Sequence, residues 1–225
     1  MIRLLRLAVP TVVVAIFIST SSAAKPAAAP ADASASSPAR AEAQEGIAKI
    51  LAVLQDRNLD RDGRAEKMRQ IMQERLDFET FSRLSIGPSW RDWTDAQREQ
   101  FVEEFKRHML GFAGKSTSKY DDQEVVIVGD DAEKNGDHTI RCRVLGKIKD
   151  GVQEDIGRLD FRLRHKEERW KVIDVHVAGI SLANTFRAQF LVIMKDGGID
   201  KLLKMMHERN AAVGNKPSRT ADAEK

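Results

Sequence analysis

Apolar residues recur with a helical period through the first half of the chain. Residues 47–54 place them three and four positions apart, which predicts one apolar stripe on a helix. After a break at 58–63 a second helix is expected around 68–72, and a third, short helix stops at Gly87-Pro88. The stripes of these three helices are formed by Ile47, Ile50, Leu51, Leu54, Met68, Ile71, Met72, Phe78, Phe81 and Leu84.

A capping box predicts where a fourth helix begins. The Thr94 hydroxyl can accept a hydrogen bond from the backbone N–H of Gln97, whose side chain can reach back to the backbone of Thr94. The helix is expected to run to about residue 112. Its apolar side carries Phe101, Phe105, Met109 and Phe112.

From Asp121 the period of the apolar residues changes to two. Strands are expected over 124–128, 138–145, 155–164 and 170–178. Asn135-Gly136 and Asp150-Gly151 lie between them, and both dipeptides suit tight hairpin turns. The third strand puts Leu159, Phe161 and Leu163 on one face and charged residues on the other. One covered face and one wet face are typical of an antiparallel meander.

Helical spacing returns after Gly179. One helix is expected from Leu182 to about Ile193, ended by Asp196-Gly197-Gly198, and a last one carries residues 199–206. The order of helices, strands and helices predicts an α+β fold, with an antiparallel sheet of about four strands covered on one face by helices.

Composition and charge exclude several classes. The chain has 225 residues, 42% hydrophobic and 32% charged, which is ordinary for a globular protein. The net charge is +3, and it becomes +1 without the two arginines of residues 1–24, so a nucleic-acid binder is not indicated. The single cysteine, Cys142, can form neither an internal disulfide nor a paired-cysteine metal site, and we expect it to be a buried small residue.

Both ends of the chain differ in composition from its middle. Residues 1–24 have a basic start, an apolar run of about 12 residues and small residues before position 25, the pattern of a cleavable signal peptide. A membrane anchor is the alternative, but the run is shorter than the roughly 20 residues that span a bilayer. Residues 25–44 are expected to be a disordered Ala/Pro-rich linker, 45–210 the folded domain and 211–225 a polar tail.

One segment resembles the nucleophile elbow of a secreted esterase or lipase. Gly179-Ile180-Ser181-Leu182-Ala183 follows a strand and opens a helix, and Asp200 and His207 follow in hydrolase order. However, the last glycine of that motif is Ala183, and the sheet is predicted to be antiparallel rather than parallel. We therefore favour a structural role, with Ser181 capping the helix.

Other polar residues have ordinary interpretations. Asp174 and His176 lie two apart on one strand and could be an acid–base pair, but a polar sheet face explains them better. The five histidines do not have the spacing of metal ligands. The basic stripe of Arg158, Arg162 and Arg164 could dock an acidic partner or lipid headgroups, or could be a solvated face.

A known family shows a similar ordered series of residues. The series is Asp77-Phe78, Arg83-Leu84, Gly87, Trp90, Thr94, Gln97, Phe101, Phe105, Arg158-Leu159-Asp160-Phe161, Trp170, Asp174, Gly179-Ile180-Ser181-Leu182, Arg187, Gln189-Phe190, Gly198-Ile199-Asp200 and Leu202. It resembles the MlaC family, the toluene-tolerance auxiliary proteins, over about residues 45–208. Thr185-Phe186 occupies a region where the family usually has tyrosine.

The resemblance implies a fold and a function. It implies an NTF2-like sheet plus a helical part, with an apolar cavity between them that holds a phospholipid by its acyl chains. It also implies a periplasmic carrier that has neither enzymatic activity nor a cofactor and that acts as a monomer. Such a carrier would shuttle lipid between an outer-membrane lipoprotein–porin complex and an inner-membrane ABC transporter with its substrate-binding ring. A related branch, HpnM, is associated with hopanoids, and the chain could belong there.

If the pocket exists, inward apolar residues of the strands and later helices should line it. The expected lipid-binding residues are Phe81, Leu84, Phe105, Met109, Ile140, Val144, Leu159, Phe161, Ile173, Val175, Phe186 and Phe190. Each of these could equally be plain core. Three hypotheses therefore stand: a lipid carrier, a hydrolase that uses Ser181, and an interaction module without a ligand.

Overall fold

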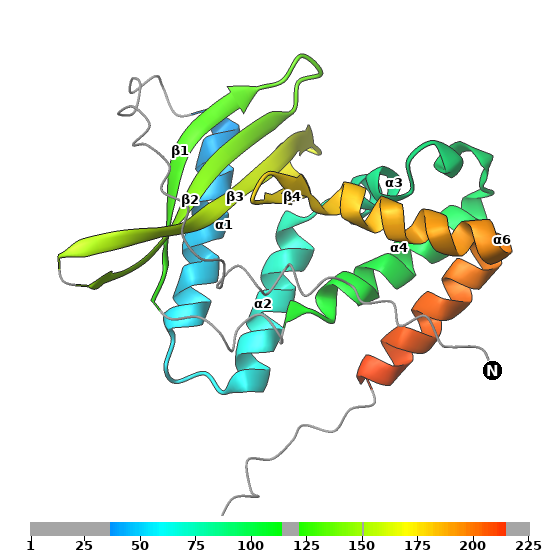
Figure 1. Ribbon diagram of the computed structural model, residues 1–225, viewed down its shortest axis with the longest axis horizontal. Coiled ribbons are helices and arrows are strands. Elements are labelled where there is room, and N and C mark those ends of the chain that lie inside the picture. The colour runs from blue at the N-terminus through cyan, green and yellow to red at the C-terminus, as the bar shows by residue number, and fades with distance from the viewer. Residues whose placement is uncertain (1–36, 114–121, 150, 215–225) are drawn as a thin grey trace, which may run out of the picture.

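A computed structural model describes residues 37–113, 122–149 and 151–214. Figure 1 shows a sheet at one side of the molecule and helices beside and beyond it. The elements are α1 (Pro38–Gln55), α2 (Arg61–Arg75), α3 (Phe78–Ile86), the 3₁₀-helix η2 (Gly87–Asp92), α4 (Asp95–Leu110), β1 (Glu124–Ala132), β2 (His138–Lys149), β3 (Val152–Lys166), β4 (Arg169–Val177), β5 (Ile180–Ser181) and α6 (Leu182–Gly214). The α+β class is confirmed.

The sheet is an antiparallel meander in the order β1-β2-β3-β4-β5. It has five strands rather than four, because the two-residue β5 pairs with the end of β4. Gly136 and Gly151 have φ values of +84° and +79°, so both predicted hairpin turns use a glycine in the left-handed region.

Bulges in β1 and β4 change which face of the sheet a residue belongs to. In β1 the pairing shifts between Ile127 and Gly129, so Val128 is the extra residue and is 49% exposed. In β4, Asp174 pairs with Arg162 and Val172 with Leu163, which leaves Ile173 without a partner across the strand.

Helices α1 and α2 lie side by side against the sheet, and α3, α4 and α6 pack beyond β4 (Figure 1). Ser37, Asp60, Asp77 and Thr94 each cap the helix that follows with a side-chain oxygen. The capping box at Thr94 is confirmed in both directions. None of the helices in the described ranges combines the length and apolarity that crossing a membrane requires.

Helix α1 begins at Pro38, earlier than expected, so the linker prediction of 25–44 is wrong for its last seven residues. Ala39 and Ala43 are 0% and 7% exposed and share a cluster with Ile140 and Cys142 of the sheet. A helix whose alanines pack closely on a sheet is as rich in alanine as a disordered linker, so composition alone does not distinguish the two. Residues 1–24 and residues 25–36 of the predicted linker lie outside the described residues.

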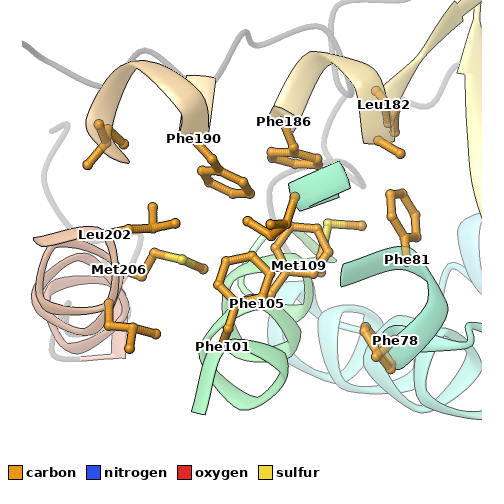
Figure 2. Close-up of a cluster of buried hydrophobic side chains, with 14 of the residues drawn as sticks. Phe78, Phe81, Phe101, Phe105, Met109, Leu182, Phe186, Phe190, Leu202 and Met206 are labelled. Carbon is orange, nitrogen blue, oxygen red and sulfur yellow. The ribbon is translucent and has the colours of Figure 1, made fainter. Parts of the chain in front are cut away.

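An aromatic cluster joins α3, α4 and α6 (Figure 2). Phe105 is its centre, with ring centroids 5.8 Å from Phe81, 5.7 Å from Phe101, 5.2 Å from Phe186 and 6.0 Å from Phe190. Edge-to-face and stacked rings at these distances add to the free energy gained by burying the rings. This cluster is a packed core, and through Val177 it holds the three helices against β4.

Helix α6 is interrupted at the predicted glycines. Gly197 and Gly198 have non-helical backbone angles, and the helix changes direction there before it continues along α4. It extends to Gly214, so the predicted polar tail begins four residues too early. Residues 215–225 lie outside the described part of the chain.

Gly87 is required at the end of α3. Its φ is +71°, and a Cβ added there would lie 2.8 Å from Nε of Arg187, which donates a hydrogen bond to the Leu84 carbonyl. We expect Gly87→Ala to lower the free energy of unfolding by about 2–3 kcal/mol, from backbone strain together with displacement of Arg187. Gly136→Ala is the comparison in urea unfolding, because its φ is also positive, at +84°, while its added Cβ would meet nothing within 4 Å. Equal losses in the two variants would contradict this role of Arg187.

A buried carboxylate holds the second part of α6 against α4. Glu104, 4% exposed, lies 2.9 Å from Nδ1 of His207 and accepts a 2.7 Å bond from Asn210. Burial raises the pKa of Glu104, but the hydrogen bonds of His207 and Asn210 and the charge of Arg107 outweigh it, so the pKa lies below its ordinary value.

This pKa direction predicts acid sensitivity of α6. A depressed folded-state pKa gives stability that is present above the unfolded value of about 4.5 and is lost as the pH falls further. We expect amide exchange in residues 199–210, corrected for its intrinsic pH dependence, to accelerate below about pH 4.5. Glu104→Gln should remove that dependence, and an unchanged profile in this variant would contradict the prediction.

Candidate functional site

A cavity of about 360 Å³ lies between the sheet and helices α1 and α2. Its size falls in the range of small-molecule pockets, roughly 300–1,000 Å³. Side chains from the end of α4 and the start of α6 close a third side. It adjoins the aromatic cluster, and Met109, Leu182, Phe186 and Val177 belong to both.

The sheet supplies one wall. Alternate residues of β3, namely Leu159, Phe161 and Leu163, face the cavity as the period of two predicted. Val125 of β1 and Val144 of β2 extend this wall. The bulge in β4 brings both Val172 and Val175 to the cavity, although they are an odd number of positions apart.

Helices α1 and α2 supply the opposite wall, which our list of lining residues missed. Their contribution is aliphatic and methionine-rich: Ala43, Ile47, Ile50, Leu51, Leu54, Met68, Ile71 and Met72. Methionine side chains are flexible and adapt to irregular partners. These stripes are visible in the sequence, but nothing in their spacing distinguishes a cavity wall from a packed core.

Six of the twelve predicted residues border the cavity: Met109, Val144, Leu159, Phe161, Val175 and Phe186. The other six lie outside the set of residues that border it, and which residues contact a lipid stays a prediction. Phe81, Phe105 and Phe190 belong to the aromatic cluster, and Leu84 packs against it. Ile140 is covered by the early turns of α1, and Ile173 is the extra residue of the β4 bulge.

Polar side chains border the cavity at only a few places in the described chain. Gln123, 9% exposed, directly precedes β1, and Glu42 and Arg75 lie where α1 meets the end of α2. Arg75 is 6% exposed and pairs with Glu42, and its Nη2 lies 2.5 Å from Glu45. The remaining wall is almost wholly apolar, which suits an apolar ligand with a polar end.

The hydrolase hypothesis is not supported by the geometry at Ser181. Its hydroxyl donates a 2.5 Å bond to Asp174 and accepts one from the backbone N–H of Asn184, so Ser181 caps α6 as favoured. His207 is bonded to Glu104 on another element. His176 lies 3.2 Å from Asp174, but that carboxylate also accepts from the backbone of Ala183. Asp174 therefore anchors the start of α6. This role differs from both interpretations of the sequence, a catalytic acid and a residue on a solvated sheet face.

The basic stripe on β3 is neutralised within the protein. Arg162 and Arg164 both bond the carboxylate of Asp137, which is 1% exposed, and Arg158 bonds Asp160. Burial raises the pKa of Asp137, but the hydrogen bond and charge of Arg164 outweigh it and lower the pKa overall. Paired arginines offer little free charge to an acidic partner.

The remaining candidate groups are inert in this fold. Cys142 is 0% exposed, as expected, and burial raises the pKa of its thiol to about 12. Among residues 37–113, 122–149 and 151–214, no three histidine, cysteine or acidic side chains gather so that they could hold a metal ion. The cavity is thus the feature around which a function can be built.

Comparison with known proteins identifies the family of the domain that contains this cavity. The family model for the MlaC protein matches residues 44–208, which is most of the chain. The chain belongs to the MlaC family. The resemblance carried by the series from Asp77 to Leu202 is thereby confirmed, whereas membership of the hopanoid-associated branch stays a prediction.

Two proteins similar to this MlaC-family chain carry informative names. Toluene tolerance protein Ttg2D of Pseudomonas putida is 28% identical over 110 residues, and the match spans 49% of each chain, so about half the length of that relative. A phospholipid-binding protein from Ralstonia solanacearum, solved in complex with a phospholipid, has 26% identity and a TM-score of 0.63. The latter match covers 79% of this chain and 99% of the other.

Proposed function

We propose that this protein is a periplasmic lipid carrier that holds a phospholipid, or a hopanoid, by its acyl or other apolar part in the cavity between the sheet and helices α1 and α2. The observation that carries the proposal is the almost wholly apolar cavity. The structural similarity to a phospholipid-binding protein in complex with its lipid supports it.

The energetics favour a ligand made of hydrocarbon. Each methylene moved from water into an apolar site contributes about 0.8 kcal/mol. An acyl chain in this apolar cavity therefore contributes several times the roughly 1 kcal/mol of a single hydrogen bond.

A lipid-carrying function is consistent with a site in which we find no set of catalytic residues among the described residues. A carrier needs an apolar interior and a way in, and no nucleophile or acid–base pair. Within the described ranges, Ser181, Asp174 and His207 are all held in structural hydrogen bonds. We therefore propose that the protein is not an enzyme.

The proposal extends to location and partners through family membership. The pattern of residues 1–24 supports export to the periplasm by a cleavable signal peptide. The carrier would move lipid between an outer-membrane lipoprotein–porin complex and an inner-membrane ABC transporter with its substrate-binding ring, acting as a monomer.

The experiment that tests carriage is analysis of the exported protein for bound lipid. The chain is expressed with export, purified without detergent and examined by native mass spectrometry, with solvent extraction to identify the cargo. We expect one or more phospholipid or hopanoid masses in complex with the protein. A protein that purifies without lipid and takes none up from vesicles would overturn the proposal.

A further inference from the structure

One buried donor at the edge of the cavity lacks a partner. The Nε of Arg75 is buried, and it has no hydrogen-bond partner among the residues that the structure describes. The side chain of Arg75 is itself part of the cavity wall. A buried N–H without an acceptor costs free energy, so such a group next to a ligand cavity indicates an acceptor on the ligand.

The other donors of Arg75 are used within the protein. Nη1 bonds the Glu42 carboxylate and, at 3.3 Å, its carbonyl oxygen. Nη2 lies 2.5 Å from Glu45 and 3.5 Å from Glu74. The guanidinium is therefore held in one orientation by three acidic side chains, and Nε is the donor left over.

The surroundings of Arg75 favour a neutral acceptor over an anion. Glu42 borders the same cavity and pairs with Arg75, so a lipid phosphate at Nε would lie close to a carboxylate. Two positive groups, Lys49 and Arg169, lie further out and pair with the same acidic residues. Like charges repel, whereas an uncharged carbonyl oxygen can accept from Nε without this penalty.

We infer that Arg75 Nε–H donates a hydrogen bond to an ester carbonyl oxygen of the bound lipid. The inference rests on the proposed function and names the lipid class more closely: ester-linked acyl lipids. The ester carbonyl stands where an acyl chain meets the polar part of the lipid. Arg75 likewise stands where the apolar walls of the cavity meet charged residues.

The test compares ester and ether lipids in the full chain. Vesicles contain equal amounts of dioleoyl phosphatidylcholine and the matching dioleyl ether-linked phosphatidylcholine, and native mass spectrometry measures which lipid the protein takes up. The wild type should prefer the ester lipid roughly ten-fold, the value of one hydrogen bond from a charged donor. Arg75→Lys keeps the positive charge but removes Nε, so its preference should fall to about one.

Arg169→Lys is the matched control, since Arg169 belongs to the same ion-pair cluster but lies outside the set of residues that border the cavity. It should keep the wild-type preference. Equal uptake of both lipids by the wild type would overturn the inference and leave the proposed function standing, without needing any variant to fold. If Arg75→Lys took up less of both lipids by the same factor, the preference for the ester lipid would not depend on Nε. That result would overturn the inference in favour of a phosphate contact. Uptake of neither lipid by the wild type would overturn the proposed function itself.

Discussion

Replacing Val175 with glutamate is expected to reduce the lipid occupancy of the purified protein more than ten-fold. Val175 lies on β4 and borders the cavity opposite α1 and α2. A carboxylate placed there would have to lose its water when an acyl chain enters, and burying an unpaired charge costs several kcal/mol. Occupancy is measured by native mass spectrometry, and thermal unfolding shows that the variant is folded.

Val128→Glu is the matched control for this prediction. Val128 is also a valine on a strand, but it is the bulge residue of β1 and is 49% exposed. It should keep the wild-type occupancy. Equal occupancy in Val175→Glu and wild type would mean that lipid does not occupy this cavity.

Phe105→Ala is expected to lower the free energy of unfolding by about 3–5 kcal/mol, the usual cost of truncating a fully buried phenylalanine. Phe105 is 0% exposed and contacts four other rings of the aromatic cluster, from α3, α4 and α6 (Figure 2). These neighbours are locked against one another, so the structure has little freedom to collapse into the space. Urea unfolding measures the loss.

Phe112→Ala is the comparison, because Phe112 borders the cavity and is only partly buried. Its truncation enlarges a space that already exists and should cost less than half as much. If the two variants lost equal stability, the distinction between a closed aromatic core and an open lipid cavity would be wrong.

The sequence predicts the elements of this fold well because most of them have local signals. The capping box of Thr94, the glycines of the two hairpins and the two glycines in α6 each fix a start, a turn or a kink within a few residues. The first turns of α1 have Ser37 as a cap and Pro38 at the first helical position, but the same residue types are common in an Ala/Pro/Ser-rich linker. Ala39 and Ala43 are helical because they pack on the sheet, a contact between residues about a hundred positions apart.

The cavity wall was only half predictable for the same reason. Alternation along β3 identifies Leu159 and Phe161 correctly, but a bulge such as that at Ile173 reverses the alternation without a mark in the sequence. The phenylalanines of α4 and α6 give each helix an apolar face in the sequence, whether that face packs against other rings or borders the cavity. That Phe105 meets rings while Met109 meets the cavity depends on how the helices cross, which is a tertiary property.

Photo-crosslinking from methionine tests most directly whether lipid occupies this cavity. Three methionines, Met68, Met72 and Met109, border it, and three others, Met194, Met205 and Met206, lie on α6 away from it. Protein exported from cells that incorporate a diazirine analogue of methionine is irradiated and digested, and its peptides are searched for lipid adducts. We predict adducts on the peptides that contain Met68, Met72 and Met109. Adducts only on the α6 peptides, or on none in a protein that carries lipid, would contradict the proposed site.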